Sequence, residues 1–168
     1  DLTKQDIDRI VGQLASINIK TVNLGGNEPI FTNGPNPKDT LLPYIIRSLY
    51  DANIIVGLTT AGITLTHLER FYPETLTFLN DMDISLDSPS PEEHNTNRGA
   101  PLFNHALKAL DICNEYGINH TIVMCGMDWN LSDWHIDELI RLARKHHAFV
   151  RINYQHQRKT QKASNFLC

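Results

Sequence analysis

The stretch Thr21-Val22-Asn23-Leu24-Gly25-Gly26-Asn27-Glu28-Pro29 combines a short strand-like run, a glycine pair and a carboxylate next to a proline. The two glycines let the backbone turn sharply and approach a ligand closely, and Pro29 fixes the local φ beside Glu28. Such a stretch is suited to holding a small polar ligand, for example a cationic amine, with main-chain groups and Glu28. It is equally consistent with a strand-to-helix turn that needs these residues only for geometry.

The same strand-then-helix pattern recurs along the chain. Strands are expected to start near residues 21, 54, 82, 120 and 149, roughly thirty residues apart. Segments with helical apolar spacing separate them, so the sequence predicts an α/β fold with a parallel sheet and right-handed crossovers. The run Ile54–Thr59 lacks polar alternation, as expected of a strand covered on both faces.

Polar and glycine residues gather where the expected strands end. Ligands bind parallel sheets at the carboxyl ends of the strands, and these ends fall at residues 25–28, 59–62, 85–87, 125–130 and 153–155. A binding site along this edge is therefore predicted. The polar stretch 88–99 is long for a strand-to-helix connection, so it is expected to be a functional loop.

Four of these segments resemble motifs of the radical S-adenosylmethionine (radical SAM) enzymes. Residues 25–29 resemble the family's G-G-E-P motif with one residue inserted, and Thr-Thr-Ala-Gly at 59–62 lies where the family often has T-N-G. Ile-Ser-Leu-Asp-Ser-Pro at 84–89 resembles I-S-L-D-G/S-P, and His-Asn-Thr-Asn-Arg-Gly at 94–99 resembles H-D-x-x-R-G. The order and spacing match, and the resemblance runs over about residues 2–154.

The resemblance implies a partial TIM-type barrel, the family's (β/α)6 core. In that family a C-x3-C-x2-C loop after the first strand holds a 4Fe–4S cluster, and S-adenosylmethionine on the fourth iron is cleaved to a 5′-deoxyadenosyl radical that abstracts a substrate hydrogen. This sequence lacks that motif. We expect the first strand and the cluster loop to lie upstream of Asp1, which leaves this piece incomplete for catalysis. Residues 1–156 would supply strands two to six, and 157–168 would begin an extension. A member that never had a cluster is the alternative.

The resemblance also implies which residues contact S-adenosylmethionine. Glu28 and the backbone of Gly25 and Gly26 would receive its ammonium group, and the planar fork of Arg98 its carboxylate. The other candidates would contact the ribose, the carboxylate or the adenosine, and they are Asn27, Thr59, Thr60, Ser85 and Asn130. Interpretations without a ligand stay open for these residues. Glu28 could be a solvated turn residue, and Ser85 could be a buried hydroxyl with a hydrogen-bond partner in the chain. The threonines could only pack, and Arg98 could be exposed.

Other polar residues near these motifs are interpreted mainly as structural. Asp87 would hold the following loop as an Asx turn, and His94 would brace that loop rather than bind metal. Cys113 is expected to be a buried apolar residue. Cys125 ends a strand that faces the expected pocket and is a candidate hydrogen donor or simply a strand residue. Cys168 is a candidate ligand of an auxiliary cluster.

The composition narrows the function classes. The 168 residues are 41% hydrophobic, which fits one domain with its own core. Fifteen Lys and Arg against nineteen Asp and Glu give a net charge of −4, which disfavours a nucleic-acid partner, and no apolar run approaches the length of a membrane span. Three widely spaced cysteines form neither a disulfide framework nor a compact metal motif, which favours a cytoplasmic setting.

The expected function is that of a radical SAM enzyme acting on a small molecule or peptide, with an electron donor such as a flavodoxin or ferredoxin. The motifs at 84–89 and 94–99 look most like members that modify peptides or proteins, the SPASM-like group. Two alternatives remain. A conventional divalent-metal-dependent barrel enzyme would use Glu28, Asp87 and His94 as ligands or acid/base groups. A non-catalytic binding module could share the fold.

Overall fold

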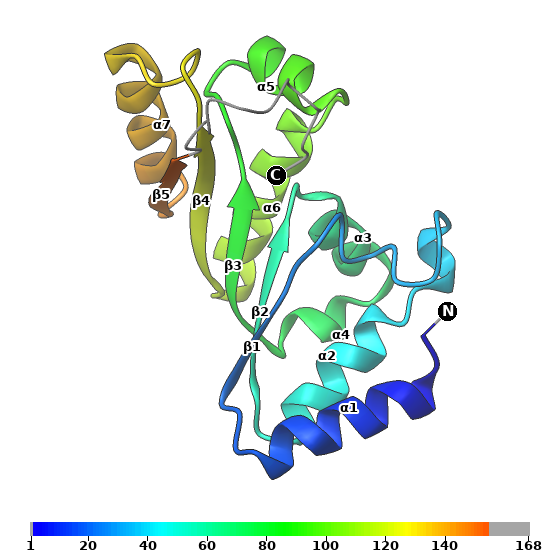
Figure 1. Cartoon of the computed structure of the whole chain (residues 1–168). Helices are drawn as coiled ribbons and strands as arrows, with labels where there is room; N and C mark the ends of the chain where they lie inside the picture. Colours follow the sequence, from blue (N-terminus) through cyan, green and yellow to red (C-terminus); the bar gives the residue numbers. More distant parts are fainter. Residues whose placement is uncertain (1, 155–168) are drawn as a thin grey trace, which may run out of the picture.

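The computed structural model describes residues 2–154 and contains a five-stranded parallel sheet (Figure 1). The strands lie side by side in chain order, β1-β2-β3-β4-β5, and each neighbouring pair is parallel. They are β1 (Thr21–Leu24), β2 (Ile55–Thr60), β3 (Leu79–Ser85), β4 (Asn119–Gly126) and β5 (Phe149–Tyr154). The predicted α/β fold with a parallel sheet is therefore confirmed.

Helices fill every connection between successive strands (Figure 1). Helix α1 (Lys4–Ser16) precedes β1, and the connections contain the 3-10 helix η1 (Pro37–Asp39), α2 (Leu42–Asp51), α3 (Ile63–Phe71), α4 (Pro73–Leu76), α5 (Pro91–Arg98), α6 (Phe103–Tyr116) and α7 (Asp133–Lys145). Each crossover moves one strand further in the same direction. Right-handed crossovers of this kind place the long helices on one face of the sheet, as in one part of a TIM-type barrel.

The core lies between the sheet and these helices. Val56, Leu58, Ile84 and Ile122 are fully buried on the strands, and Leu110 is fully buried on α6. Burial of such side chains is the main favourable term in folding. None of the helices between residues 2 and 154 combines the length and hydropathy that a membrane-spanning segment needs.

The second face of the sheet is polar, which corrects one prediction. The strand predicted at Ile54–Thr59 was expected to be covered on both faces, but Ile55 is 47% exposed and Thr59 is half-buried. Neighbouring side chains on that face pair with each other: the Thr59 hydroxyl donates to Asn23 Oδ1 (3.1 Å), and Arg151 on β5 reaches Asp83 on β3 (2.5 Å). The error arose because the glycine and threonines of the strand mask its alternation.

The stretch predicted as a loop at 88–99 contains a helix instead. The Ser90 hydroxyl accepts from the Glu93 N–H, Pro91 occupies the first turn, and Gly99 ends α5 in the left-handed conformation. These are the ordinary start and stop signals of a helix. The segment has too few apolar residues to show helical periodicity, so only its caps could have revealed α5 from the sequence.

Candidate functional site

The predicted motifs meet at the carboxyl edge of the sheet. Leu24 pairs with Leu58, Thr60 with Ile84, and Ser85 with Val123, so the segments that follow β1, β2, β3 and β4 lie in neighbouring positions. A cavity of about 640 Å³ opens beside the first motif, and its lining includes Gly25, Asn27 and Glu28. The edge predicted from the sequence is therefore the edge at which the structure gathers the candidate residues.

Glu28 connects the turn after β1 to the start of α3. Its Oε1 accepts hydrogen bonds from the Thr60 hydroxyl, the Thr64 N–H (2.8 Å) and the Thr64 hydroxyl (2.5 Å). Its Oε2 accepts from the Ala61 N–H (2.9 Å). Because Gly62 has no side chain to cap α3, Glu28 supplies the acceptor that the first turn of a helix requires. The interpretation of Glu28 as a solvated turn residue is wrong, and its remaining acceptor capacity lies mainly on Oε2.

Asp87 is the centre of a second hydrogen-bonded group. The residue is 1% exposed, and its Oδ1 accepts from the Cys125 N–H on β4 (3.0 Å). Its Oδ2 accepts from the Asn97 amide (3.0 Å) and lies 2.6 Å from Nε of Arg98. Asp87 is structural, as predicted, but it binds β4 and α5 rather than forming an Asx turn with its own backbone.

Arg98 is mostly enclosed, with a side chain that is 10% exposed. The alternative that it is an exposed arginine is therefore wrong. Its ion pair with Asp87 orients the guanidinium at the carboxyl edge, where a planar fork can bind a carboxylate. Contact between Arg98 and a cofactor stays a prediction.

Asn130 has a structural role that the sequence did not reveal. It is fully buried, and its amide donates to the backbone carbonyls of Asp87 (2.8 Å) and Cys125 (2.9 Å). Its Oδ1 accepts from the Met127 N–H (2.7 Å). Both N–H groups of the amide therefore hold the loops after β3 and β4 together, and the ribose contact stays a prediction.

The remaining candidates divide between the two faces. Thr60 is buried, and its hydroxyl also accepts a hydrogen bond from the N–H of Gly62 (2.8 Å), the residue before α3. Thr60 therefore packs inside the protein, as the plainer interpretation predicted. Thr59 and Ser85 are half-buried on the polar face, where a ligand could reach them. Cys125 is buried at the end of β4. Cys168 and residues 157–168 lie outside the described residues.

His94 braces the loop after β3, as predicted. Its Nδ1 accepts from the Asp87 N–H (3.1 Å), while its Nε2 is buried with no hydrogen-bond partner among residues 2–154. Burial, followed by the nearby charge of Arg98, lowers the pKa of His94 to about 4. His94 is therefore neutral at physiological pH.

This depressed pKa predicts a loss of stability in acid. Between about pH 4 and 6.5 the unfolded chain binds a proton that the folded chain refuses, so the free energy of unfolding falls as the pH falls through this window. We expect the wild type to lose about 1–2 kcal/mol more than His94→Asn between pH 7 and pH 5. Asparagine keeps an acceptor for the Asp87 N–H but does not titrate. Urea unfolding of both proteins at the two pH values measures the difference, and equal losses would contradict the role of His94.

The described residues do not fit a metal cluster. Between residues 2 and 154, no group of three or more His, Cys, Asp or Glu side chains is arranged to hold a metal ion. Glu28, Asp87 and His94 each accept hydrogen bonds from the chain's own donors.

The fold is that of a partial barrel, and the candidate residues gather at the carboxyl edge of its parallel sheet. The chain belongs to the radical SAM superfamily, because the model of that family matches residues 1–143. Members of this family use S-adenosylmethionine and a 4Fe–4S cluster.

Relatives of known identity agree with this assignment. GTP 3′,8-cyclase from Synechocystis sp. (strain ATCC 27184 / PCC 6803 / Kazusa) is 26% identical over 172 residues, and the match covers 95% of this chain and 48% of the relative. The chain thus spans about half of the length of this curated relative. Two structures of native anSMEcpe share the fold. The form with bound AdoMet has a TM-score of 0.70, 15% identity, and coverage of 98% of this chain and 46% of its own. The form with AdoMet and the Kp18Cys peptide has a TM-score of 0.67, 16% identity, and coverage of 91% and 43%.

Proposed function

We propose that this chain is the S-adenosylmethionine-binding part of a radical SAM enzyme. The observation that supports this most directly is the family match over residues 1–143, which includes all four motifs at the carboxyl edge. Together with a reduced 4Fe–4S cluster, S-adenosylmethionine would supply the family's radical chemistry, which is the removal of a hydrogen atom from the substrate. The cysteines that hold the cluster would come from another part of the whole protein, since the described residues do not fit it.

In this proposal the turn after β1 binds the ammonium group of S-adenosylmethionine. Oε2 of Glu28 receives one protein donor and Oε1 receives three, so Oε2 can accept a further charge-assisted bond. The backbone carbonyls of Gly25 and Gly26 and the side chain of Asn27 would complete the cradle. Thr59 and Ser85, which are half-buried on the polar face, would lie along the rest of the ligand.

We further propose a peptide as the substrate and a flavodoxin or ferredoxin as the electron donor, in the cytoplasm. The motifs at 84–89 and 94–99 favour the peptide-modifying group, and a structural relative has been solved with a peptide bound. The GTP 3′,8-cyclase relative points instead to a nucleotide. Incubating the enzyme separately with peptide and with GTP, and measuring consumption of each, distinguishes the two substrates.

The decisive experiment uses the full-length protein, reconstituted anaerobically with iron and sulfide. Dithionite and S-adenosylmethionine are added, and 5′-deoxyadenosine is measured by mass spectrometry. Formation of 5′-deoxyadenosine together with cluster absorbance supports the proposal. A protein that forms neither the cluster nor the product overturns it and leaves a binding module of the same fold.

Arg98 provides a test of the cofactor site. The Arg98→Ala variant of the reconstituted protein should bind S-adenosylmethionine about 1.5–3 kcal/mol more weakly, because one charge-assisted contact is lost. Arg47→Ala is the matched control, since Arg47 also pairs with an aspartate, Asp51 (2.9 Å), but lies on α2, outside the four motifs. Calorimetry measures the affinity for S-adenosylmethionine. Urea unfolding checks that the variant is still folded after Asp87 loses its ion-pair partner. Unchanged affinity in a folded Arg98 variant would remove Arg98 from the site.

A further inference from the structure

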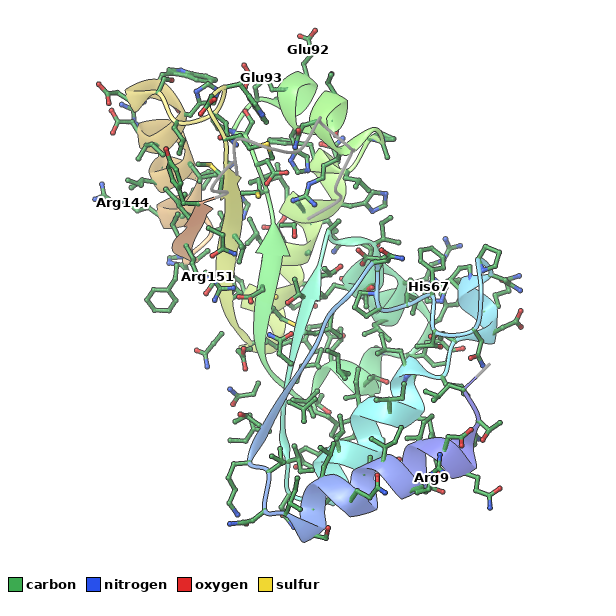
Figure 2. All side chains as sticks on the ribbon, in the orientation of Figure 1. Arg9, His67, Glu92, Glu93, Arg144 and Arg151 are labelled. Carbon is green, nitrogen blue, oxygen red and sulfur yellow. The ribbon has the colours of Figure 1, made fainter. Side chains whose placement is uncertain are left out.

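A second cavity, of about 590 Å³, is lined in part by the motif at 94–99. Four of its lining residues, Glu92, Glu93, Thr96 and Asn97, lie on α5, and the fifth, Trp129, lies on the connection between β4 and α7. Figure 2 shows Glu93 on the side of α5 that faces this connection. The cavity therefore brings two carboxylates and an indole ring together from segments far apart in the sequence.

The Glu93 carboxylate is fixed in position by both sides of the cavity. Its Oε2 accepts from the Ser88 hydroxyl (2.5 Å) and lies 2.9 Å from Nε2 of His135 on α7. Ser132 in turn binds Nδ1 of His135 (2.7 Å). The hydrogen bond from Ser88 and the contact with His135 lower the pKa of Glu93, so this carboxylate is charged at neutral pH. Both contacts end on Oε2, so Oε1 has no hydrogen-bond partner among residues 2–154 and can accept from a ligand.

Aromatic contacts hold the indole beside these carboxylates. Trp129 packs edge-on against the His135 ring at 6.2 Å, and Trp134 packs against the same ring at 4.8 Å. Both indoles remain partly exposed, Trp129 by 38% and Trp134 by 52%. Exposed aromatic rings next to carboxylates are the usual surroundings of an organic cation, which is attracted by the ring face and by the negative charge.

None of the described residues that line this cavity is a lysine or an arginine. Between residues 88 and 140 the basic side chains are Arg98 and Lys108, and they pair with Asp87 (2.6 Å) and Glu69 (2.8 Å). On the acidic side, Asp128 and Asp133 flank the two tryptophans and add to the charge of α5. A net negative rim with an exposed indole is complementary to a positively charged ligand.

We propose that this cavity binds the ammonium or guanidinium group of a lysine or arginine side chain in the substrate. The inference rests on the proposed function, in that it specifies which peptides the enzyme would take: those with a basic residue near the reacting position. Thr96 and Asn97 supply polar groups at the wall of the cavity, and Glu92 and Glu93 supply the charge.

The test uses two blocked tripeptides, one with a central lysine and one with a central norleucine, which has a side chain of similar length but no charge. Tryptophan fluorescence of the full-length protein is titrated with each peptide, and subtraction of the Trp129→Phe titration isolates the signal from this rim. We expect saturable binding of the lysine peptide that is at least about fivefold tighter than that of the norleucine peptide. The arginine tripeptide should behave like the lysine one, and added salt should weaken both.

Glu92→Gln should weaken binding of the lysine peptide by about threefold to tenfold. Glu74→Gln is the matched control, because Glu74 is exposed and also follows the proline that begins a helix, but it lies on α4 at the opposite edge of the sheet. Equal affinities for the two peptides, or equal effects of the two substitutions, would overturn the inference. If the wild type binds the lysine peptide selectively but never forms 5′-deoxyadenosine, the proposed function fails and the cation site stands.

Discussion

Replacing Gly62 with alanine is expected to lower the free energy of unfolding by roughly 2–5 kcal/mol. Gly62 has φ of 106°, in the left-handed region, which costs other residues about 1–2 kcal/mol. A Cβ at this position would also lie 2.3 Å from the backbone carbonyl carbon and oxygen of His105 on α6. Backbone atoms cannot rotate away as a side chain would, so α3 and α6 must separate, and such overpacking costs about 1–3 kcal/mol.

The matched control for Gly62 is Gly99→Ala. Gly99 also has a positive φ, 67°, but an added Cβ would meet no atom within 4 Å. The free energy of unfolding of the control should therefore fall only by the cost of the left-handed backbone conformation, about 1–2 kcal/mol. Urea unfolding of both variants measures the difference. Equal losses would show that the close approach of the turn after β2 to α6 is not tight, and the packing of α3 on α6 would need revision.

Replacing Glu28 with glutamine is expected to destabilise the protein by about 2–4 kcal/mol and to abolish binding of S-adenosylmethionine. Four donors converge on the carboxylate: the hydroxyls of Thr60 and Thr64 and the N–H groups of Ala61 and Thr64. A glutamine amide has one oxygen and one NH₂ group, so in either orientation at least one of these donors would face another donor. The start of α3 would also lose the negative charge that its dipole favours.

Glu69→Gln provides the control for Glu28. Glu69 pairs with Lys108 on the surface (2.8 Å), and such pairs contribute about 1 kcal/mol or less. Chemical unfolding of the two variants compares their stabilities, and calorimetry with the reconstituted protein compares their affinities for S-adenosylmethionine. A Glu28 variant as stable as the Glu69 variant would mean that the carboxylate does not cap α3. Normal affinity would place the ammonium group elsewhere.

These two predictions concern one small region, the turns after β1 and β2, where stability and binding meet. Glu28 must accept hydrogen bonds from the donors at the start of α3 and also leave Oε2 accessible to a ligand. Gly62 must let α3 start close to α6. A site built in this way is fixed before the ligand arrives, because its acceptor is already held by four donors. The G-G-N-E-P stretch therefore serves the fold through the hydrogen bonds of Glu28, and its role in binding a ligand stays a proposal.

The sequence determined the elements and the edge at which they meet. Apolar residues at helical spacing predicted the long helices, and short strand-like runs about thirty residues apart predicted the parallel strands. The order of strands and helices then predicted that residues 25–28, 59–62 and 85–87 would share an edge, because parallel strands all end on the same side. The family motifs came from these same residues, so the family could be identified from the sequence.

What only the tertiary structure decided is which side chains bind one another across that edge. Glu28 caps a helix that starts 35 residues later, and Asn130 joins two loops whose anchors, Asp87 and Cys125, are 38 residues apart. No local pattern encodes such pairs, because each polar group is satisfied by whichever donor or acceptor the folded chain brings within about 3 Å. The helix α5 and the cavity beside Trp129 were missed for a related reason, since a short polar helix and a rim built from two distant segments leave no apolar periodicity in the sequence.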